Sequence, residues 1–178
     1  MVTSGGRTSD ETLSPGQWLR VEREWRDGDD IRVELPLEIR TERRYRNALT
    51  VHRGPLVFGL RIGEKRRLIA GTPNPAPGEP SPDWEILPTT PWNYALCPQN
   101  GFTVEQSPIY ELPFDESHVP ITLKAAGRRV PEWTLVDNSA GLTPMSRVQT
   151  REPEESIELT PYGSGNLRIA EFPTFEEG

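Results

Sequence analysis

Residues 18–40, WLRVEREWRDGDDIRVELPLEIR, carry the clearest structural signal in this sequence. In the second half of this stretch, IRVELPLEIR, apolar residues alternate strictly with charged residues and one proline. Because neighbouring side chains of a β-strand point to opposite faces, this period of two predicts a half-buried strand. Asp27-Gly28 separates that run from WLRVEREW, and glycine tolerates the positive φ of a tight turn. The stretch therefore predicts a β-hairpin.

The rest of the chain repeats this β theme. Its 178 residues include 19 prolines and 15 glycines, which favours short strands and frequent turns over long helices. Residues 48–62, ALTVHRGPLVFGLRI, predict two strands with a break at Gly54-Pro55, whereas TERRYRN before them is interpreted as a charged connection. Further strands are predicted in KRRLIA, FTVEQ, VPITLKAA, EWTLV, SIELTPYG and LRIAEFPTF. With no helical periodicity of useful length, the predicted class is all-β, built from small antiparallel sandwiches of the jelly-roll kind.

Charge and proline are unevenly distributed along the chain. The net charge is −7, and an acidic protein is a poor candidate for binding nucleic acid, whose phosphates need clustered Lys and Arg. Residues 18–67 hold thirteen Lys/Arg against nine Asp/Glu, and residues 68–178 hold six against sixteen. This split indicates either two modules that dock on each other or, as we favour, charged outer faces of hairpins. Eight prolines in residues 72–100 indicate a loop or linker, and a module boundary in or beside it.

Residue types that bind metals or anchor proteins are scarce. Cys97 is the only cysteine, so neither an internal disulfide nor a cysteine zinc site is predicted. His52 and His118 lie far apart without ligand spacing, and we predict no metal and no cofactor. No apolar run approaches twenty residues, so no membrane helix is expected. The polar N-terminal segment does not resemble a signal peptide, and with the single cysteine it favours a cytoplasmic location.

The sequence assembles no catalytic constellation. It contains no G-x-S-x-G motif, and Gly163-Ser164-Gly165 is read as a turn. Cys97 has no nearby base or positive charge in the sequence to lower its pKa, so a packed thiol is predicted. Among 27 acidic residues, sequence alone cannot select the carboxylate pair that a glycosidase needs. No catalytic residue is therefore predicted, and the chain by itself is not expected to be an enzyme.

The aromatic residues of DWEILPTTPWNYAL, residues 83–96, are the candidates for ligand binding. Flat aromatic faces stack on sugar rings, which makes Trp84, Trp92 and Tyr94 a candidate carbohydrate platform. The alternative is that they anchor the core, because buried aromatic side chains cover a large apolar area. Trp92 and Tyr94 share a face if the segment is a strand. We favour core packing, with this stretch starting the second sandwich.

Several of these segments together resemble a known family. The order of WLRVEREWRDGDDIRVELPLEIR, VHRGPLVFGL, DWEILPTTPWNYAL, VPEWTLV and IELTPYGSGNLRIAEFP is similar to that in the C-terminal β-region of glycoside hydrolase family 127. These are the β-L-arabinofuranosidase-like proteins, also classed as a domain of unknown function. The resemblance covers most of the chain from about residue 18 to residue 172.

The resemblance implies an architecture of two β-sandwich modules that follow an α/α six-hairpin barrel. A first module would span residues 18–67 and be completed by the C-terminal strand at about 155–175. Residues 68–154 would form the second module, after a flexible lead-in at residues 1–17. A lead-in that lacks early strands would leave an open sheet edge, which invites pairing with another chain and suggests a homodimer.

The resemblance also implies a function. The family's zinc ligands, nucleophile and acid/base residue belong to the barrel, which this chain lacks, so none of those roles transfers to a residue here. The expected function is that of a non-catalytic accessory region that packs on the barrel. The alternative is a carbohydrate-binding module for arabinose-containing glycans. Eighteen arginines against two lysines hint at a bacterial source with a GC-rich genome.

Overall fold

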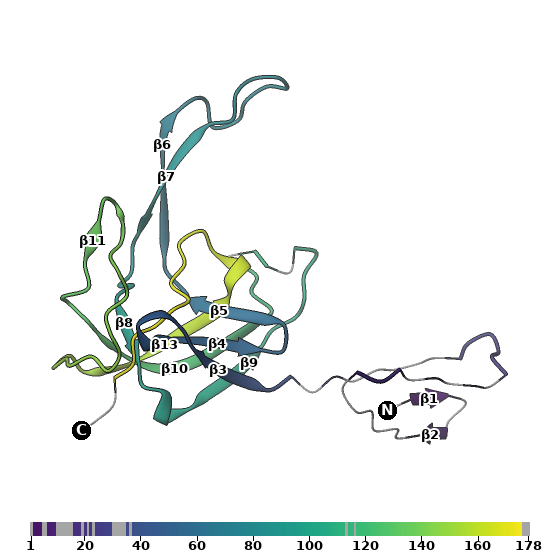
Figure 1. Cartoon of the computed structure of the whole chain (residues 1–178). Helices are drawn as coiled ribbons and strands as arrows, with labels where there is room; N and C mark the ends of the chain where they lie inside the picture. Colours follow the sequence, from purple (N-terminus) through teal and green to yellow (C-terminus); the bar gives the residue numbers. More distant parts are fainter. Residues whose placement is uncertain are drawn as a thin grey trace. The chain divides into compact units, whose positions relative to one another are not determined.

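A computed structural model describes residues 2–4, 7–9, 16–18, 20, 22, 24–29, 35, 37–112, 114–115 and 117–175. The chain divides into two compact units, residues 1–37 and residues 38–178. In the described residues the protein is all-β, with antiparallel strands and only three-residue 3-10 turns as helical segments, which confirms the predicted class (Figure 1).

The described residues of the first unit form a short hairpin and a tight turn. Strands β1 (Val2–Ser4) and β2 (Arg7–Ser9) pair antiparallel within the expected lead-in. Asp29 N–H donates to the Arg26 carbonyl at 3.1 Å, and Gly28 has φ +84°, so the turn predicted at Asp27-Gly28 is present. Of the strands predicted on both sides of it, residues 19, 21, 23, 31–34 and 36 lie outside the described residues. The described residues 18, 20, 22, 24, 25, 35, 37 and 38 are not in a strand, and only residues 39–40 are, as the start of β3.

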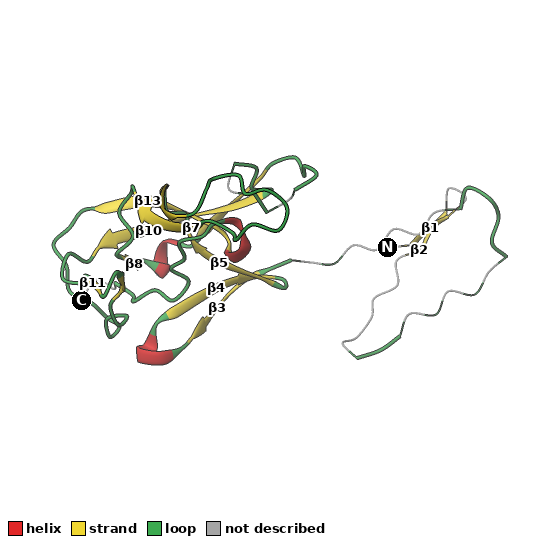
Figure 2. Cartoon of the chain, turned by 90° about the horizontal axis from the view of Figure 1, so that it is seen from above, coloured by secondary structure: helices red, strands yellow, loops and turns green. Residues whose placement is uncertain are grey.

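The second unit is built on one curled seven-stranded sheet, whose strands run in the order β3-β4-β5-β13-β10-β8, with β9 also paired to β10 (Figures 1 and 2). Their bounds are β3 (Ile39–Arg43), β4 (Leu49–Arg53), β5 (Leu56–Leu60), β8 (Tyr94–Leu96), β9 (Phe102–Gln106), β10 (Ile121–Arg129) and β13 (Glu154–Pro161). The 3-10 turns are η1 (Tyr45–Asn47), η2 (Pro98–Asn100) and η3 (Tyr162–Ser164). Strands from both predicted modules thus share one sheet, and the division into two modules stays a prediction.

Alternation along the central strands creates the core. In β10, Ile121, Leu123 and Ala125 are buried while the residues between them are partly exposed, because the pleat sends every second side chain to the same face. A large cluster includes these residues with Phe58, Leu96, Leu159 and Phe172. A second cluster contains Ala95, Cys97, Val130, Trp133, Val148 and Phe175.

The C-terminal segment bridges β4 and β8 of the curled sheet. Phe172 exchanges hydrogen bonds with Leu49 of β4, at 2.7 and 2.9 Å. Leu96 of β8 bonds the Pro173 carbonyl at 2.9 Å and accepts from Phe175 N–H at 2.8 Å. Phe172 and Thr174 are completely buried. The C-terminal segment thus lies against β4 and β8, where it forms isolated bridges and not one regular strand.

Two hairpins extend from this sheet. Strands β6 (Glu64–Ala70) and β7 (Asp83–Pro88) form a long arm with the proline-rich residues 71–82 at its tip (Figure 1). At its base, Thr89 N–H bonds the Gly63 carbonyl at 2.7 Å and Gly63 N–H bonds Thr90 Oγ1 at 2.8 Å. The smaller hairpin joins β11 (Leu135–Val136) to β12 (Ser139–Ala140).

Two secondary-structure predictions were wrong. The predicted connection TERRYRN is wrong in its first part, because residues 41–43 belong to β3 and pair with β4, and only residues 44–48 connect the two strands. A strand at a sheet edge can carry charged side chains on its solvent side. In EWTLV only Leu135 and Val136 form a strand. Trp133 lies at the end of the turn before this strand, where its N–H bonds the Val130 carbonyl. Its side chain packs in the second core cluster.

Candidate functional site

The second half of residues 83–96 packs against a tryptophan from elsewhere in the chain. Trp92 contacts Trp133 edge to face, with ring centroids 5.2 Å apart and planes at 72°. Trp133 is 4% exposed, and its Nε1–H donates to the Gly141 carbonyl at 2.8 Å. Trp92 is half-buried and lies against both core clusters. The pair therefore bridges the two clusters, as expected for aromatic residues that anchor a core.

Asn93 fixes this arrangement from the other side of the backbone. Its side-chain amide donates to the carbonyls of Val130 and Trp133, at 2.9 and 3.2 Å. The Asn93 carbonyl in turn accepts from Val130 N–H at 2.8 Å. A buried amide with these partners ties residues 92–94 to the turn that carries Trp133.

Tyr94 is part of the first core cluster and is 5% exposed. Its hydroxyl donates to Glu155 Oε2 at 2.8 Å. Burial, followed by the bond to the Glu155 carboxylate, raises the pKa of Tyr94 to about 12. The ring faces the core, so a ligand in solution reaches little of it.

Trp84 has a different setting from Trp92 and Tyr94. It lies on β7 opposite Leu68 of β6 and is 39% exposed. Among the described residues, no ring contact joins it to Trp92 or Tyr94. The structure therefore brings Trp92 and Tyr94 to the same core, and places Trp84 on the arm.

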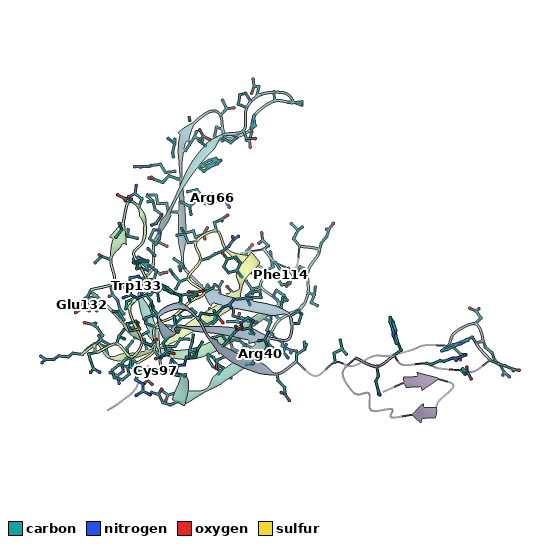
Figure 3. All side chains as sticks on the ribbon, in the orientation of Figure 1. Arg40, Arg66, Cys97, Phe114, Glu132 and Trp133 are labelled. Atoms are coloured by element: carbon teal, nitrogen blue, oxygen red, sulfur yellow. The ribbon has the colours of Figure 1, made fainter. Side chains whose placement is uncertain are left out.

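An apolar hollow opens on the surface beside the turn between β4 and β5. It has a volume of about 460 Å³, and its lining is formed by Pro55, Leu56, Val57, Phe114, Pro161, Tyr162 and Gly163. Phe114 is 44% exposed (Figure 3), and the Arg168 guanidinium lies 4.8 Å from the Tyr162 ring centroid. The loop that carries Phe114 also exposes Ile109, Tyr110 and Leu112. Such a concentration of exposed apolar side chains is typical of a surface that contacts another protein.

Asp115, Ser117 and His118 form a small polar group next to this hollow. The Asp115 carboxylate accepts from both the N–H and the hydroxyl of Ser117, and these bonds hold the pKa of Asp115 below its usual value. His118 Nδ1 lies 3.3 Å from Ser117 Oγ. The His118 ring packs on the Tyr110 ring, with centroids 4.6 Å apart. His118 Nδ1 also lies 3.6 Å from Asp115 Oδ1, so the aspartate and the serine both contact the same ring nitrogen. A Ser-His-Asp triad needs the aspartate on one ring nitrogen and the serine on the other, and this group therefore lacks the relay of a triad.

Cys97 is buried in the second core cluster, as predicted for a packed thiol (Figure 3). Burial, followed by the nearby Glu154 carboxylate, raises the pKa of this thiol. Within the described ranges, no group of three or more His, Cys, Asp or Glu residues is placed to hold a metal ion. No helix in those ranges has the length and hydrophobicity to span a membrane.

Comparisons of this chain with protein-family models, with curated proteins and with solved structures found no match.

Sequence reasoning missed the role of Trp133 and the apolar hollow. For Trp133, the available signal was its place two residues after a proline in VPEW, since a turn there can direct a large side chain inward. The hollow is formed by residues more than a hundred positions apart, Leu56 and Tyr162 among them. No local pattern could have brought them together.

Proposed function

We propose that this chain is a non-catalytic accessory β-sandwich region of a β-L-arabinofuranosidase-like glycoside hydrolase, and that it packs on and supports a catalytic α/α barrel. The order of motifs along the sequence supports the family, and the use of Trp92, Trp133 and Tyr94 in the core supports a structural role. The observation that carries the proposal is the apolar hollow.

The chemistry of the hollow favours protein over sugar. Sugar hydroxyls need hydrogen-bond partners, and a sugar site combines an aromatic face with convergent polar groups. Here the lining consists of Pro, Leu, Val, Phe and Tyr side chains and one glycine backbone, and the Tyr162 hydroxyl is the polar side-chain group among them. An apolar side chain from a neighbouring domain fits this lining. Burying it there would stabilise the contact by roughly 1.5–3 kcal/mol.

Binding to a barrel domain tests this proposal. The chain is titrated into an α/α barrel of the resembled family that has been expressed without its own β-region, and heat of binding is measured. We expect saturable binding that weakens about tenfold in Phe114→Asp, since a charge placed in the hollow must be desolvated. Leu142→Asp is the matched control, because Leu142 is 75% exposed and does not line the hollow. No binding by the wild-type chain, or equal weakening by both variants, would contradict the proposal.

The alternative function is a carbohydrate-binding module that uses Trp84, Trp92 and Tyr94. The exposed ring of Trp84 on the arm favours it, since that face is available for stacking. Trp92 and Tyr94 contribute less exposed surface because both pack on the core. If the chain binds arabinose-containing oligosaccharides and this binding depends on Trp84, the chain is a carbohydrate-binding module and not an accessory region.

A further inference from the structure

The outer edge of β9 is an unpaired sheet edge along which the apolar core reaches the surface. β9 pairs with β10 on one side, with Phe102, Val104 and Gln106 opposite Ala125, Leu123 and Ile121. Those three residues of β10 are buried core residues. Val104 therefore lies on the core face of the sheet and yet is 37% exposed.

Hydrogen bonding shows which backbone groups of β9 point outward. Ser107 N–H donates to the Pro120 carbonyl at 2.9 Å, so this pair is of the hydrogen-bonded kind. Because bonded and non-bonded pairs alternate along antiparallel strands, Glu105 and Thr103 are the β9 residues bonded to β10. Phe102, Val104 and Gln106 turn their N–H and C=O groups away from β10. Within the described chain, no backbone group pairs with them there.

The other ends of the sheet are protected. The outer side of β8 is covered by the C-terminal segment, through the bonds of Leu96 to Pro173 and Phe175. At β3 the edge carries Arg40, Glu42 and Arg43, and charged side chains are a common device against edge-to-edge pairing. β9 has no proline and no bulge, and its one charge, Glu105, is paired with Lys124 at 2.6 Å.

We propose that β9 pairs antiparallel with β9 of a second copy of this chain, about a two-fold axis at Val104. In this register Val104 lies opposite its own symmetry mate, and Phe102 lies opposite Gln106. Each of these pairs exchanges two backbone hydrogen bonds, because their polar groups are the ones that point outward. On the solvent face Thr103 lies opposite Glu105, so no like charges oppose each other.

A second copy is favoured over an unrelated strand because the register is self-complementary. Isologous contacts require the same patch to satisfy itself, and this five-residue edge does so in both its hydrogen bonds and its side chains. The pairing covers the exposed part of Val104 and extends the sheet across the dimer. This surface does not include any residue of the apolar hollow. The dimer can therefore be wrong while docking on a barrel is right, and the reverse.

Sedimentation equilibrium of the full chain tests the pairing from micromolar to near-millimolar concentration. We expect a mass near twice 20.1 kDa that falls toward the monomer value on dilution. Val104→Lys places two ammonium groups against each other at the axis and should weaken the dimer about tenfold or more. The matched control is Thr41→Lys on the other edge strand, β3, which should leave the dimer unchanged.

Hydrogen exchange keeps the test decisive if a variant fails to fold. In the wild-type chain the Val104 amide should be protected at high concentration and exchange quickly on dilution, whereas the Glu105 amide, bonded to β10, should stay protected throughout. A monomer at every concentration would overturn the proposal. A dimer that survives Val104→Lys, or whose Val104 amide exchanges freely, would place the interface elsewhere and overturn it too.

Discussion

Residues 83–88 and residues 92–96 belong to the same aromatic stretch of sequence, but they have opposite roles in the structure. The first part forms β7 of the arm, where Trp84 is opposed by Leu68 and remains exposed. The second part enters the core, where Trp92 contacts Trp133 and Tyr94 joins the main cluster. Pro88 is the last residue of β7, and Pro91 lies between the two parts, before β8 begins. Aromatic composition therefore does not determine burial; what each segment packs against in the folded chain does.

Replacing Trp92 should have the largest effect in this comparison. Trp92→Ala removes the edge-to-face contact with Trp133 and opens a void between the two core clusters. Loss of a large buried aromatic costs roughly 3–5 kcal/mol, and the half-buried position of Trp92 puts the expected value near 3 kcal/mol. Chemical denaturation measures it. A free energy of unfolding equal to that of the wild type would show that residues 92–96 do not anchor the core.

Asn93→Ala should have the next largest effect. The change removes the side-chain donor from the carbonyls of Trp133 and Val130, of which Val130 keeps its bond from Trp133 N–H, at a total cost of about 2 kcal/mol. Asn93→Asp is an informative companion, since a carboxylate cannot donate to either carbonyl and should destabilise at least as much. Urea denaturation of the three proteins would reveal a purely steric role if Asn93→Asp matched the wild type.

Glu64 connects the base of the arm to the loop after η3, and its loss should have a smaller, pH-dependent effect. Its carboxylate accepts from Leu167 and Asn166 N–H groups, at 2.6 and 2.7 Å, and from the Asn166 side-chain amide at 2.8 Å. Burial alone would raise the pKa of Glu64, but the bonds from Leu167 and Asn166 outweigh it, so the pKa lies below its usual value.

Because the folded-state pKa is depressed, this stabilisation is present above the unfolded-state pKa and is lost as pH falls through the folded value. We expect Glu64→Gln to lower stability by about 1 kcal/mol at neutral pH. The difference from the wild type should shrink as the pH falls below about 4. Thermal unfolding across this range measures it, and a difference that is constant with pH would contradict the assignment.

Replacing Trp84 should have the smallest effect on stability. Trp84→Ala removes a partly exposed ring on a two-stranded arm, and surface changes of this kind usually stay within about 0.5 kcal/mol. The same denaturation series gives the value. A loss comparable to that of Trp92→Ala would mean that the arm is packed as tightly as the core.

Local patterns predicted much of the fold. Features that depend on neighbours in sequence could be predicted. They are the turn at Asp27-Gly28, the break at Gly54-Pro55 and the strands in FTVEQ and VPITLKAA. A return of the C-terminal segment to the first strands was expected only through the family resemblance. The bonds from Asn166 and Leu167 to Glu64 join residues about a hundred positions apart, which no periodicity encodes.

The candidate site was less predictable for the same reason. Sequence spacing placed Trp92 and Tyr94 on one side of a segment, and both do contact the same core cluster. It could not separate Trp84 from them, because the pairing of β7 with β6 across residues 71–82 is a tertiary choice.

We claim that the aromatic residues of 83–96 serve the structure and do not bind sugar. A tryptophan-fluorescence titration of the whole chain with arabinose, galactose and xylose oligosaccharides is the most direct test of this claim. We expect a flat response over the full range of each sugar, because Trp92 and Trp133 are packed in the core and the proposed partner of the apolar hollow is a protein domain. A saturable shift that disappears in a folded Trp84→Ala or Trp92→Ala variant would contradict it, and would make residues 83–96 a carbohydrate-binding site.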